Sequence, residues 1–301
     1  MNPTASCWPL PSPPLINQGV TIKIKILSDS TCDLSEQLLK EHNITLAPLT
    51  VVKGDEQFKD GVTITPADIF AHVANGGALC STSANSIGEY ADLFEQYAAD
   101  YDGVIHITIG SGFSTCYQSA CLAAEDFSNV RVIDSQNLST GQGLVVLKAC
   151  QLAQTATDLD TLAEELRGFT EKVEASFLVD KLDYLVKGGR CSSVAALGAN
   201  LMNLKPCIEV RGGKMMVVKK YRGNYSKCLA SYVRERLENR EDLDDGTLFV
   251  TKTVVSDECY QGVMEAVHTY GSFRNVYETT AGCTVSCHCG PGTLGILFVK
   301  K

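Results

Sequence analysis

The chain has 301 residues, of which 45% are hydrophobic and 20% are charged, a composition that excludes collagen and a disordered chain. It carries 35 acidic and 26 basic residues, which gives a formal net charge of −9. This balance excludes a protein that coats nucleic acid, because phosphate binding needs a basic surface, and it gives no broad attraction to anionic lipid. The length predicts about two domains.

The segment 1–20 holds five of the nine prolines and shows no apolar periodicity, so we expect a loosely ordered tail. No secretory signal is visible, and no run approaches the ~18 consecutive apolar residues of a membrane-spanning helix. The 13 cysteines are odd in number and scattered, which favours free thiols in a reducing compartment. We therefore expect a soluble, cytoplasmic protein without a membrane-spanning segment.

The first part of the globular chain alternates β-branched runs with helical segments. The segments 65–68 and 86–89 each place Thr or Ser three residues before an acid, a capping box that begins a helix. The polar segment 53–61 contains two glycines and predicts a turn region. Strands that alternate with helices indicate a parallel, Rossmann-like sheet, whose ligands bind beyond the C-terminal strand ends. The predicted strands are 21–27, 44–52, 103–109 and 130–134, and the predicted helices are 33–42, 86–101, 114–125, 139–154 and 159–173, with another that begins at 65.

From about residue 175 the pattern changes to an α+β arrangement with antiparallel pairs. Gly212 and Gly213 separate two apolar runs, which predicts a hairpin. We place a domain boundary near residue 155, so the sequence predicts an N-terminal α/β domain over 21–155 and a C-terminal α+β domain over 156–301. The predicted strands of this part are 176–179, 207–210, 215–221, 247–255, 275–279 and 294–299, and its predicted helices are 224–238 and 257–270.

Ser114 follows a strand and a turn that contains Gly110 and Gly112, and it precedes a helix. At the N-cap of that helix it lies beside free N–H groups and a partial positive charge, which suit an anion. Its hydroxyl can donate to a carboxylate or phosphate. The alternative is that Ser114 only caps its helix, and these residues alone favour that interpretation.

A second segment rich in hydroxyl groups, 81–86, lies at another junction of strand and helix. It contains Thr82 and Ser83 and ends at Ser86, the expected cap of the next helix. Two such loops that leave one edge of a sheet can converge on the same anion. The alternative is an ordinary loop.

The segment 283–289 contains three cysteines and His288. Adjacent Cys-His-Cys gives poor geometry for one tetrahedral zinc ion, and the sequence offers no partner CxxC, so we expect no metal site. The Gly-Pro-Gly sequence at 290–292 forces a turn that can present the His288 imidazole to a cleft. The alternative is a hydrogen-bonded loop histidine.

Local positive charge occurs at Arg190 and in a cluster of Lys219, Lys220, Arg222 and Lys227. The simpler interpretation of the cluster is a solvated edge strand and helix face. The functional alternative is recognition of phosphate or of an acidic partner. The sequence lacks the nucleophile elbow of serine hydrolases, the dinucleotide-binding loop and the P-loop.

Taken together, these residues resemble the DegV family of bacterial fatty-acid-binding proteins. The resemblance covers about residues 22–301, and it depends on the order and spacing of short motifs more than on any one of them. The motifs lie at 28–34, 60–61, 65–66, 82–83, 112–120, 132–135, 182–185, 188–190, 205–206 and 288–292.

The resemblance implies a two-domain protein that buries one long-chain fatty acid in a tunnel between its domains, with no cofactor and no catalytic residue. It assigns the carboxylate to hydroxyl groups of Thr82, with Ser83 adjacent, and of Ser114, with His288 close to the head group. It also implies a function as a carrier, which presents the acid to a fatty acid kinase. The acyl-phosphate product then serves an acyltransferase in phospholipid synthesis.

Arg190 and Arg222 match basic positions that would serve the kinase encounter or contact the phosphate. The sequence departs from the usual family pattern at Cys289, where Thr is more common, and in the bulky segment 113–116, which bears on the preferred chain length. Two alternatives remain. One is a serine-dependent esterase or acyltransferase that uses Ser114 or Ser83 with His288, and the other is a redox or metal-sensing module built on the cysteines.

Overall fold

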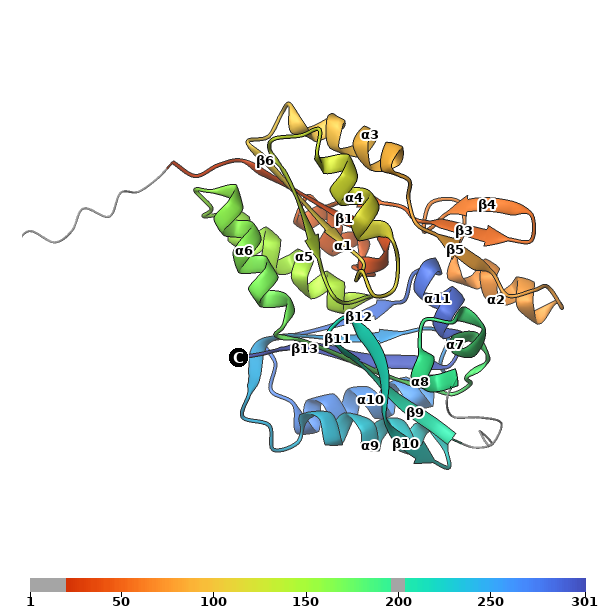
Figure 1. The fold of residues 1–301 in the computed structure, drawn as a ribbon. Coiled ribbons are helices and arrows are strands. Elements are labelled where there is room, and N and C mark those ends of the chain that lie inside the picture. Colours follow the sequence, from red (N-terminus) through yellow and green to blue (C-terminus); the bar gives the residue numbers. More distant parts are fainter. Residues whose placement is uncertain (1–19, 196–203) are drawn as a thin grey trace, which may run out of the picture.

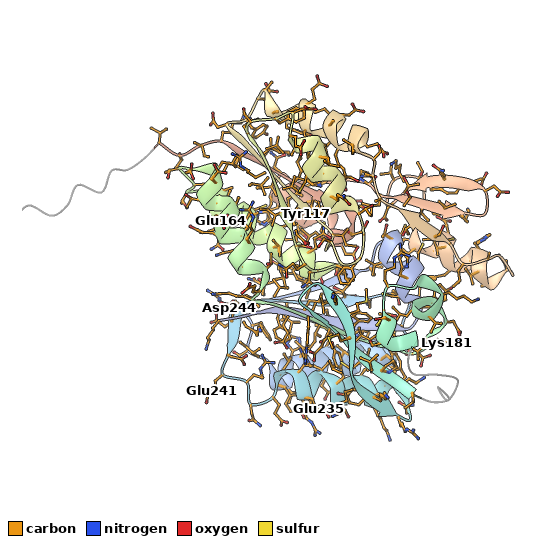
Figure 2. The ribbon with its side chains drawn as sticks, viewed as in Figure 1. Tyr117, Glu164, Lys181, Glu235, Glu241 and Asp244 are labelled. Carbon is orange, nitrogen blue, oxygen red and sulfur yellow. The ribbon has the colours of Figure 1, made fainter. Side chains whose placement is uncertain are left out.

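The computed structural model describes residues 20–195 and 204–301, so the predicted tail over 1–20 lies outside the described residues except for Val20. Two α/β layers stack on each other, and a smaller three-stranded sheet with helix α2 (Pro66–Ala74) extends to one side (Figure 1). Acidic side chains such as Glu164, Glu235 and Glu241 are exposed on the outer surface (Figure 2).

The N-terminal layer is a parallel sheet, as the sequence predicts. Its order is β2-β1-β6-β7, and all neighbours are parallel. Helices α3 and α4 pack on one another and on β6, whereas α5 and α6 pack on one another and on β1, β6 and β7. The bounds are β1 Ile24–Asp29, a 3-10 turn Ser30–Cys32, α1 Glu36–Glu41, β2 Thr45–Ala47, α3 Ile87–Ala98, β6 Gly103–Thr108, α4 Cys116–Ala124, β7 Val130–Asp134, α5 Thr140–Ala153 and α6 Leu159–Thr170.

The C-terminal layer is a six-stranded sheet in the order β10-β9-β8-β13-β11-β12, antiparallel except for the pair β11 and β12. The predicted hairpin is confirmed, with Gly212 and Gly213 at positive φ in its turn. The bounds are β8 Val173–Val179, α7 Asp183–Gly188, α8 Ser192–Ala195, β9 Leu204–Arg211, β10 Lys214–Arg222, α9 Tyr225–Leu237, β11 Leu243–Lys252, α10 Asp257–Tyr270, β12 Asn275–Thr280, α11 Cys283–Cys289 and β13 Thr293–Lys300.

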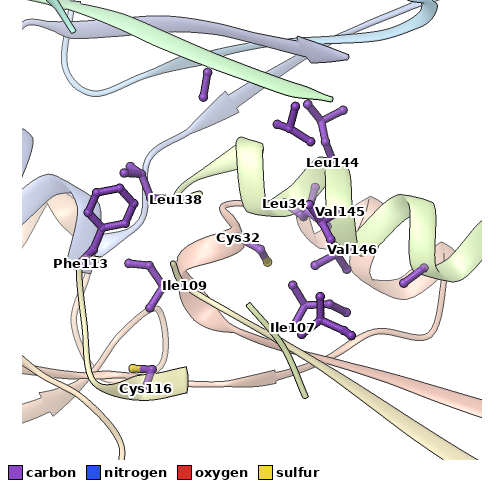
Figure 3. Close-up of a cluster of buried hydrophobic side chains, with 14 of the residues drawn as sticks. Cys32, Leu34, Ile107, Ile109, Phe113, Cys116, Leu138, Leu144, Val145 and Val146 are labelled. Carbon is purple, nitrogen blue, oxygen red and sulfur yellow. The ribbon is translucent and has the colours of Figure 1, made fainter. Parts of the chain in front are cut away.

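Helix α5 lies between the two layers, where it contacts β1 and β6 on one side and β8 and β13 on the other. Its first seven residues are all buried, which is typical of a helix covered on every side. Its side chains, among them Leu144 and Val146, belong to one hydrophobic cluster that includes strands of both sheets (Figure 3). The two layers therefore share a core.

The segment 44–52 was predicted as one strand, and this prediction is wrong. Pro48 separates β2 from β3 (Thr50–Lys53), because proline has no N–H to continue a ladder. Strand β3 leaves the parallel sheet and pairs with β4 (Glu56–Lys59) and β5 (Ser81–Ser83). The predicted turn region 53–61 therefore contains a strand, and its turn is tight because Gly54 adopts positive φ. Likewise, the predicted helix 159–173 ends at Thr170, since Val173 already begins β8.

Helix α11, Cys283–Cys289, was not predicted. It packs against α7 of the C-terminal layer and against α2, β3 and β5 of the N-terminal part. Its N-cap, Gly282, has no side chain to satisfy the free N–H groups of the first turn. Asp60 replaces that cap, since its Oδ1 accepts from Cys283 N–H at 2.9 Å and its Oδ2 from Thr284 N–H at 3.2 Å.

A second carboxylate supports the same turn. Asp33 Oδ1 accepts from Gly282 N–H at 2.9 Å, and its Oδ2 accepts from Ser139 Oγ at 2.6 Å. Burial, together with the negative charge of Asp60, raises the pKa of Asp33 to about 8. The Asp60 carboxylate also interacts favourably with the partial positive charge of the helix N-terminus, and Asp33 holds the same turn through its hydrogen bonds. They fix α11 to the first 60 residues of the chain.

We expect Asp60→Ala to lower the free energy of unfolding by about 2–4 kcal/mol, because two backbone N–H groups and the half-buried hydroxyl of Ser30 lose their acceptor. Urea denaturation measures this change. The matched control is Asp158→Ala, which removes an exposed cap from α6 and should cost only about 1 kcal/mol. Equal losses in the two variants would contradict the role of Asp60.

Candidate functional site

A pocket lies where α11, β5 and the turn before α4 meet, and about 530 Å³ of it is free of atoms, part of this open to solvent. It brings together residues that are distant in the chain, among them Thr82 and His288, which lie 206 positions apart. The predicted residues Thr82, Ser83, Ser114, His288 and Arg190 all line this pocket. Arg222 does not line the pocket. It lies at the end of β10, where it is exposed.

His288 and Thr82 form the polar centre of the pocket. Thr82 Oγ1 and His288 Nε2 are 2.8 Å apart. His288 was expected in a loop before a forced turn, but it lies in the last turn of α11, and Gly290 at positive φ follows the helix. Gly188 lets the ring pack against α7, since a Cβ there would lie 2.7 Å from His288 Nδ1.

His288 is a neutral imidazole near pH 7. Burial is the main cause that lowers its pKa to about 4, and the positive charge of Arg190 adds to this shift. The exposed Arg190 side chain donates to Gly188 O at 2.9 Å. Its guanidinium lies at the wall of the pocket and lends it the positive charge that His288 lacks.

Ser114 was expected at the N-cap of its helix, and this expectation is wrong by one residue. Thr115 is the N-cap and α4 begins at Cys116, so Ser114 precedes the helix. Its hydroxyl accepts from Cys116 N–H at 3.3 Å and donates to Cys116 Sγ at 3.1 Å. Gly112 is required nearby, because a Cβ there would lie 2.1 Å from Gly213 O in the hairpin of the C-terminal sheet.

The turn that carries Ser114 is anchored from below by Asp29, a fully buried residue at the end of β1. Its Oδ2 accepts from Ile109 N–H at 2.9 Å, and its Oδ1 accepts from Tyr90 Oη at 2.8 Å and lies 3.2 Å from His106 Nε2. These contacts fix the end of β6, from which the turn departs. They hold Ser114 in place without contacting it.

Thr82 and Ser83 do not leave the edge of the parallel sheet, as was expected of a loop there. They belong to β5 in the small antiparallel sheet, where Thr82 pairs with Val51. The expected convergence with Ser114 occurs nevertheless, but from two different sheets. Ser83 is exposed, and its hydroxyl donates to Ala84 O at 3.2 Å.

A second pocket, with about 400 Å³ free of atoms, lies next to the first, between the start of α5 and the C-terminal sheet. Its walls include the apolar side chains of Phe177 and Leu297. Leu138, Val285 and Cys289 line both pockets, and we call these three residues the neck. The first pocket, which contains the polar groups of Thr82, Ser114 and His288 among mostly apolar walls, therefore shares the neck with a second pocket that is almost wholly apolar.

The structure does not favour the metal or redox alternative. Across 20–195 and 204–301, no group of three or more His, Cys, Asp or Glu side chains is placed to hold a metal ion, and the cysteines there are free. Burial raises the pKa of the thiols of Cys283 and Cys289 to about 12, so both remain protonated at neutral pH. Protonated thiols are poor ligands and poor nucleophiles.

The esterase alternative requires a serine that is activated by His288. His288 Nε2 instead faces Thr82, while the hydroxyls of Ser83 and Ser114 are bonded to Ala84 O and Cys116. A serine that lacks a hydrogen bond to a base is a weak nucleophile. The arrangement is suited to binding an anion through neutral donors.

Sequence reasoning missed Thr284, which lines the pocket one helical turn before His288. Residues four apart on a helix share a face, so the signal existed only if the segment was known to be helical.

None of the helices in the described part of the chain is long and apolar enough to cross a membrane.

Comparison with known proteins gives a consistent result. Residues 23–301 match the model of the DegV family. A DegV domain-containing protein of Deinococcus radiodurans is 30% identical over 276 residues, which are 91% of this chain and 98% of that protein. One from Clostridium acetobutylicum is 30% identical over 292 residues, 93% of this chain and 99% of that protein.

Solved structures show the same architecture. A DegV family protein from Thermus thermophilus, described as binding fatty acid, is 27% identical with a TM-score of 0.84, over 93% of this chain and 100% of that chain. A protein from Eubacterium ventriosum, described as binding stearic acid, is 27% identical with a TM-score of 0.79, over 92% of this chain and 98% of that chain.

We expect the stability of the protein to fall as the pH drops from 6.5 to 4, in part because unfolding lets His288 take up a proton. The folded pKa of about 4 lies below the unfolded value of 6.5, so the unfolded state binds more protons in this window. His288→Asn should lack this component. The free energy of unfolding of the wild type, minus that of the variant, should fall by on the order of 3 kcal/mol between pH 7 and pH 4. Urea denaturation at each pH measures it. A pH-independent difference would show that the imidazole is not buried in its neutral form.

Proposed function

The chain belongs to the DegV family, and we therefore propose that it is a carrier that binds one long-chain fatty acid in a buried tunnel formed by the two joined pockets. The observation that carries this proposal is the neck, where a pocket that contains several polar groups adjoins an almost wholly apolar pocket. Related proteins from Thermus thermophilus and Eubacterium ventriosum are described as binding fatty acids, which supports the same ligand here.

The head group of the ligand suits the first pocket, which contains the polar side chains. We assign the carboxylate to Thr82, Ser83, Ser114 and His288, which converge there from two sheets and α11. All four are neutral near pH 7, since hydroxyl groups carry no charge and the pKa of His288 is lowered to about 4. Neutral donors orient a carboxylate without forming an ion pair, so its oxygens remain able to react with a phosphate donor.

The alkyl chain supplies most of the affinity. Each buried CH₂ contributes about 0.8 kcal/mol, so an acyl chain gains more from an apolar pocket than its head group gains from a few hydrogen bonds. The second pocket lies against the shared core of the two layers, with Phe177 and Leu297 among its walls. A ligand that fills it is shielded from water.

We further propose that the carrier presents the carboxylate to a fatty acid kinase in the cytoplasm, and that an acyltransferase uses the acyl-phosphate. Arg190 supports this step, because it is exposed at the rim of the pocket and its charge would stabilise an added phosphate. Arg222 is exposed outside both pockets, so its contribution would be to contact with the kinase. The free cysteines of the described ranges are compatible with a reducing compartment.

Purified protein should release close to one fatty acid per chain on extraction and mass spectrometry, and delipidated protein should bind palmitate. Ser114→Ala should weaken palmitate binding by about 10-fold, because a carboxylate loses a donor. The control is Ser111→Ala, since Ser111 lies in the same turn but donates to Asp134 outside the pocket. Absence of lipid together with absence of palmitate binding would refute the proposal.

A series of saturated acids tests the tail pocket. In the wild type, the affinity should rise about threefold to fourfold with each added CH₂ until the pocket is full. Val285→Phe narrows the neck, so its affinity should stop rising at a shorter chain, whereas Val285→Ile should follow the wild type more closely. Isothermal titration measures each dissociation constant. An affinity that does not depend on chain length in the wild type would argue against a tunnel.

A further inference from the structure

The first pocket contains a hydroxyl group that has no partner. Thr284 lines this pocket and is 5% exposed, and its Oγ1 is buried without a hydrogen bond to any described residue. A buried hydroxyl that makes no hydrogen bond destabilises a folded protein. Such a group at the wall of a pocket indicates that its partner arrives with the ligand.

The position of Thr284 explains why the protein itself offers no acceptor. A threonine within a helix commonly donates to the carbonyl four residues before it. For Thr284 this carbonyl belongs to Thr280, which is the last residue of β12 and lies outside α11. The backbone of Thr284 is also held in place, because the Thr284 N–H donates to Asp60 Oδ2.

The other hydroxyls of the pocket are already used. Those of Thr82, Ser83 and Ser114 all have partners within the protein. Among the hydroxyl side chains that line this pocket in the described part of the chain, that of Thr284 alone is unpaired. It lies four residues before His288, so the two side chains occupy the same face of α11.

We propose that the Thr284 hydroxyl donates a hydrogen bond to the carboxylate of the bound fatty acid and thereby selects an acid over an uncharged head group. This inference rests on the proposed function. An ionised carboxylate has about four acceptor positions, so it accommodates a donor from α11 in addition to Thr82 and Ser114, whose hydroxyls must first exchange their present partners for the carboxylate. A hydrogen bond to a charged oxygen is stronger than one to a neutral oxygen, which is the source of the selection.

Thr284→Val removes the hydroxyl and keeps the shape of the side chain. We expect it to weaken palmitate binding about 10-fold or more, but to weaken binding of hexadecanol, which has the same chain and no charge, by less than threefold. Thr284→Ser retains a hydroxyl, so it should stay within threefold of the wild type for both ligands. Isothermal titration of the delipidated full-length protein supplies all six dissociation constants.

The stability of the ligand-free variants separates a binding role from a structural one. Because the hydroxyl is unpaired in the absence of ligand, Thr284→Val should be at least as resistant to urea as the wild type. The control is Thr31→Val, which removes a fully buried hydroxyl that donates to Gln142 Oε1 at 2.7 Å outside both pockets. This control should lower urea resistance and leave the preference for palmitate over hexadecanol unchanged.

Three outcomes would overturn the inference: equal palmitate affinity in Thr284→Val and wild type, equal losses for palmitate and hexadecanol, or a less stable ligand-free Thr284→Val. If Thr284→Val does not fold, a loss of the palmitate preference in Thr284→Ser would also overturn it. Each of these leaves the proposed function intact as long as the wild type binds palmitate. A wild type that binds no palmitate refutes the proposed function together with this inference.

Discussion

The attachment of one short helix by two carboxylates is the constraint on which the pocket depends. Helix α11 has seven residues, too few to be stable alone, and its N-cap is a glycine. Asp33 and Asp60 accept hydrogen bonds from its first N–H groups and thereby tie the end of the chain to its beginning. Because α11 carries polar side chains to one pocket and neck residues to both, its position sets the geometry of the whole cavity.

The remaining walls of the cavity are positioned by close approaches between the two layers. Helix α5 is buried between them, and Leu138, just before it, contributes to the neck. The Gly112 turn approaches the hairpin of the C-terminal sheet so closely that a side chain would not fit. The two pockets thus lie side by side where the two layers meet, and they share the neck residues.

Local sequence signals predicted most of the fold, and they failed where distant residues decide the structure. The capping boxes at 65–68 and 86–89 and the Gly212–Gly213 hairpin were recognisable, because each is specified within a few residues. Helix α11 shows no polar face, since six of its seven residues are buried, and its cap lies more than 220 residues away. Thr284 was missed for this reason, because its position on the same face as His288 follows only once the segment is known to be helical. The sequence analysis named five residues that line the first pocket, but the sheet that carries Thr82 became visible only in three dimensions. The five are Thr82, Ser83, Ser114, Arg190 and His288.

The separation of Asp33 and Asp60 from α11 also governs when the binding cavity can form during synthesis. The hydrogen bonds that hold this helix join residues 249 and 223 positions apart. Contacts between such distant segments form late in folding, because the entropy cost of closing a long loop comes before the stabilisation that the contacts provide. Nearly the entire polypeptide must therefore leave the ribosome before the cavity has all its walls. A ligand that depends on every one of these walls can therefore bind only a nearly complete chain.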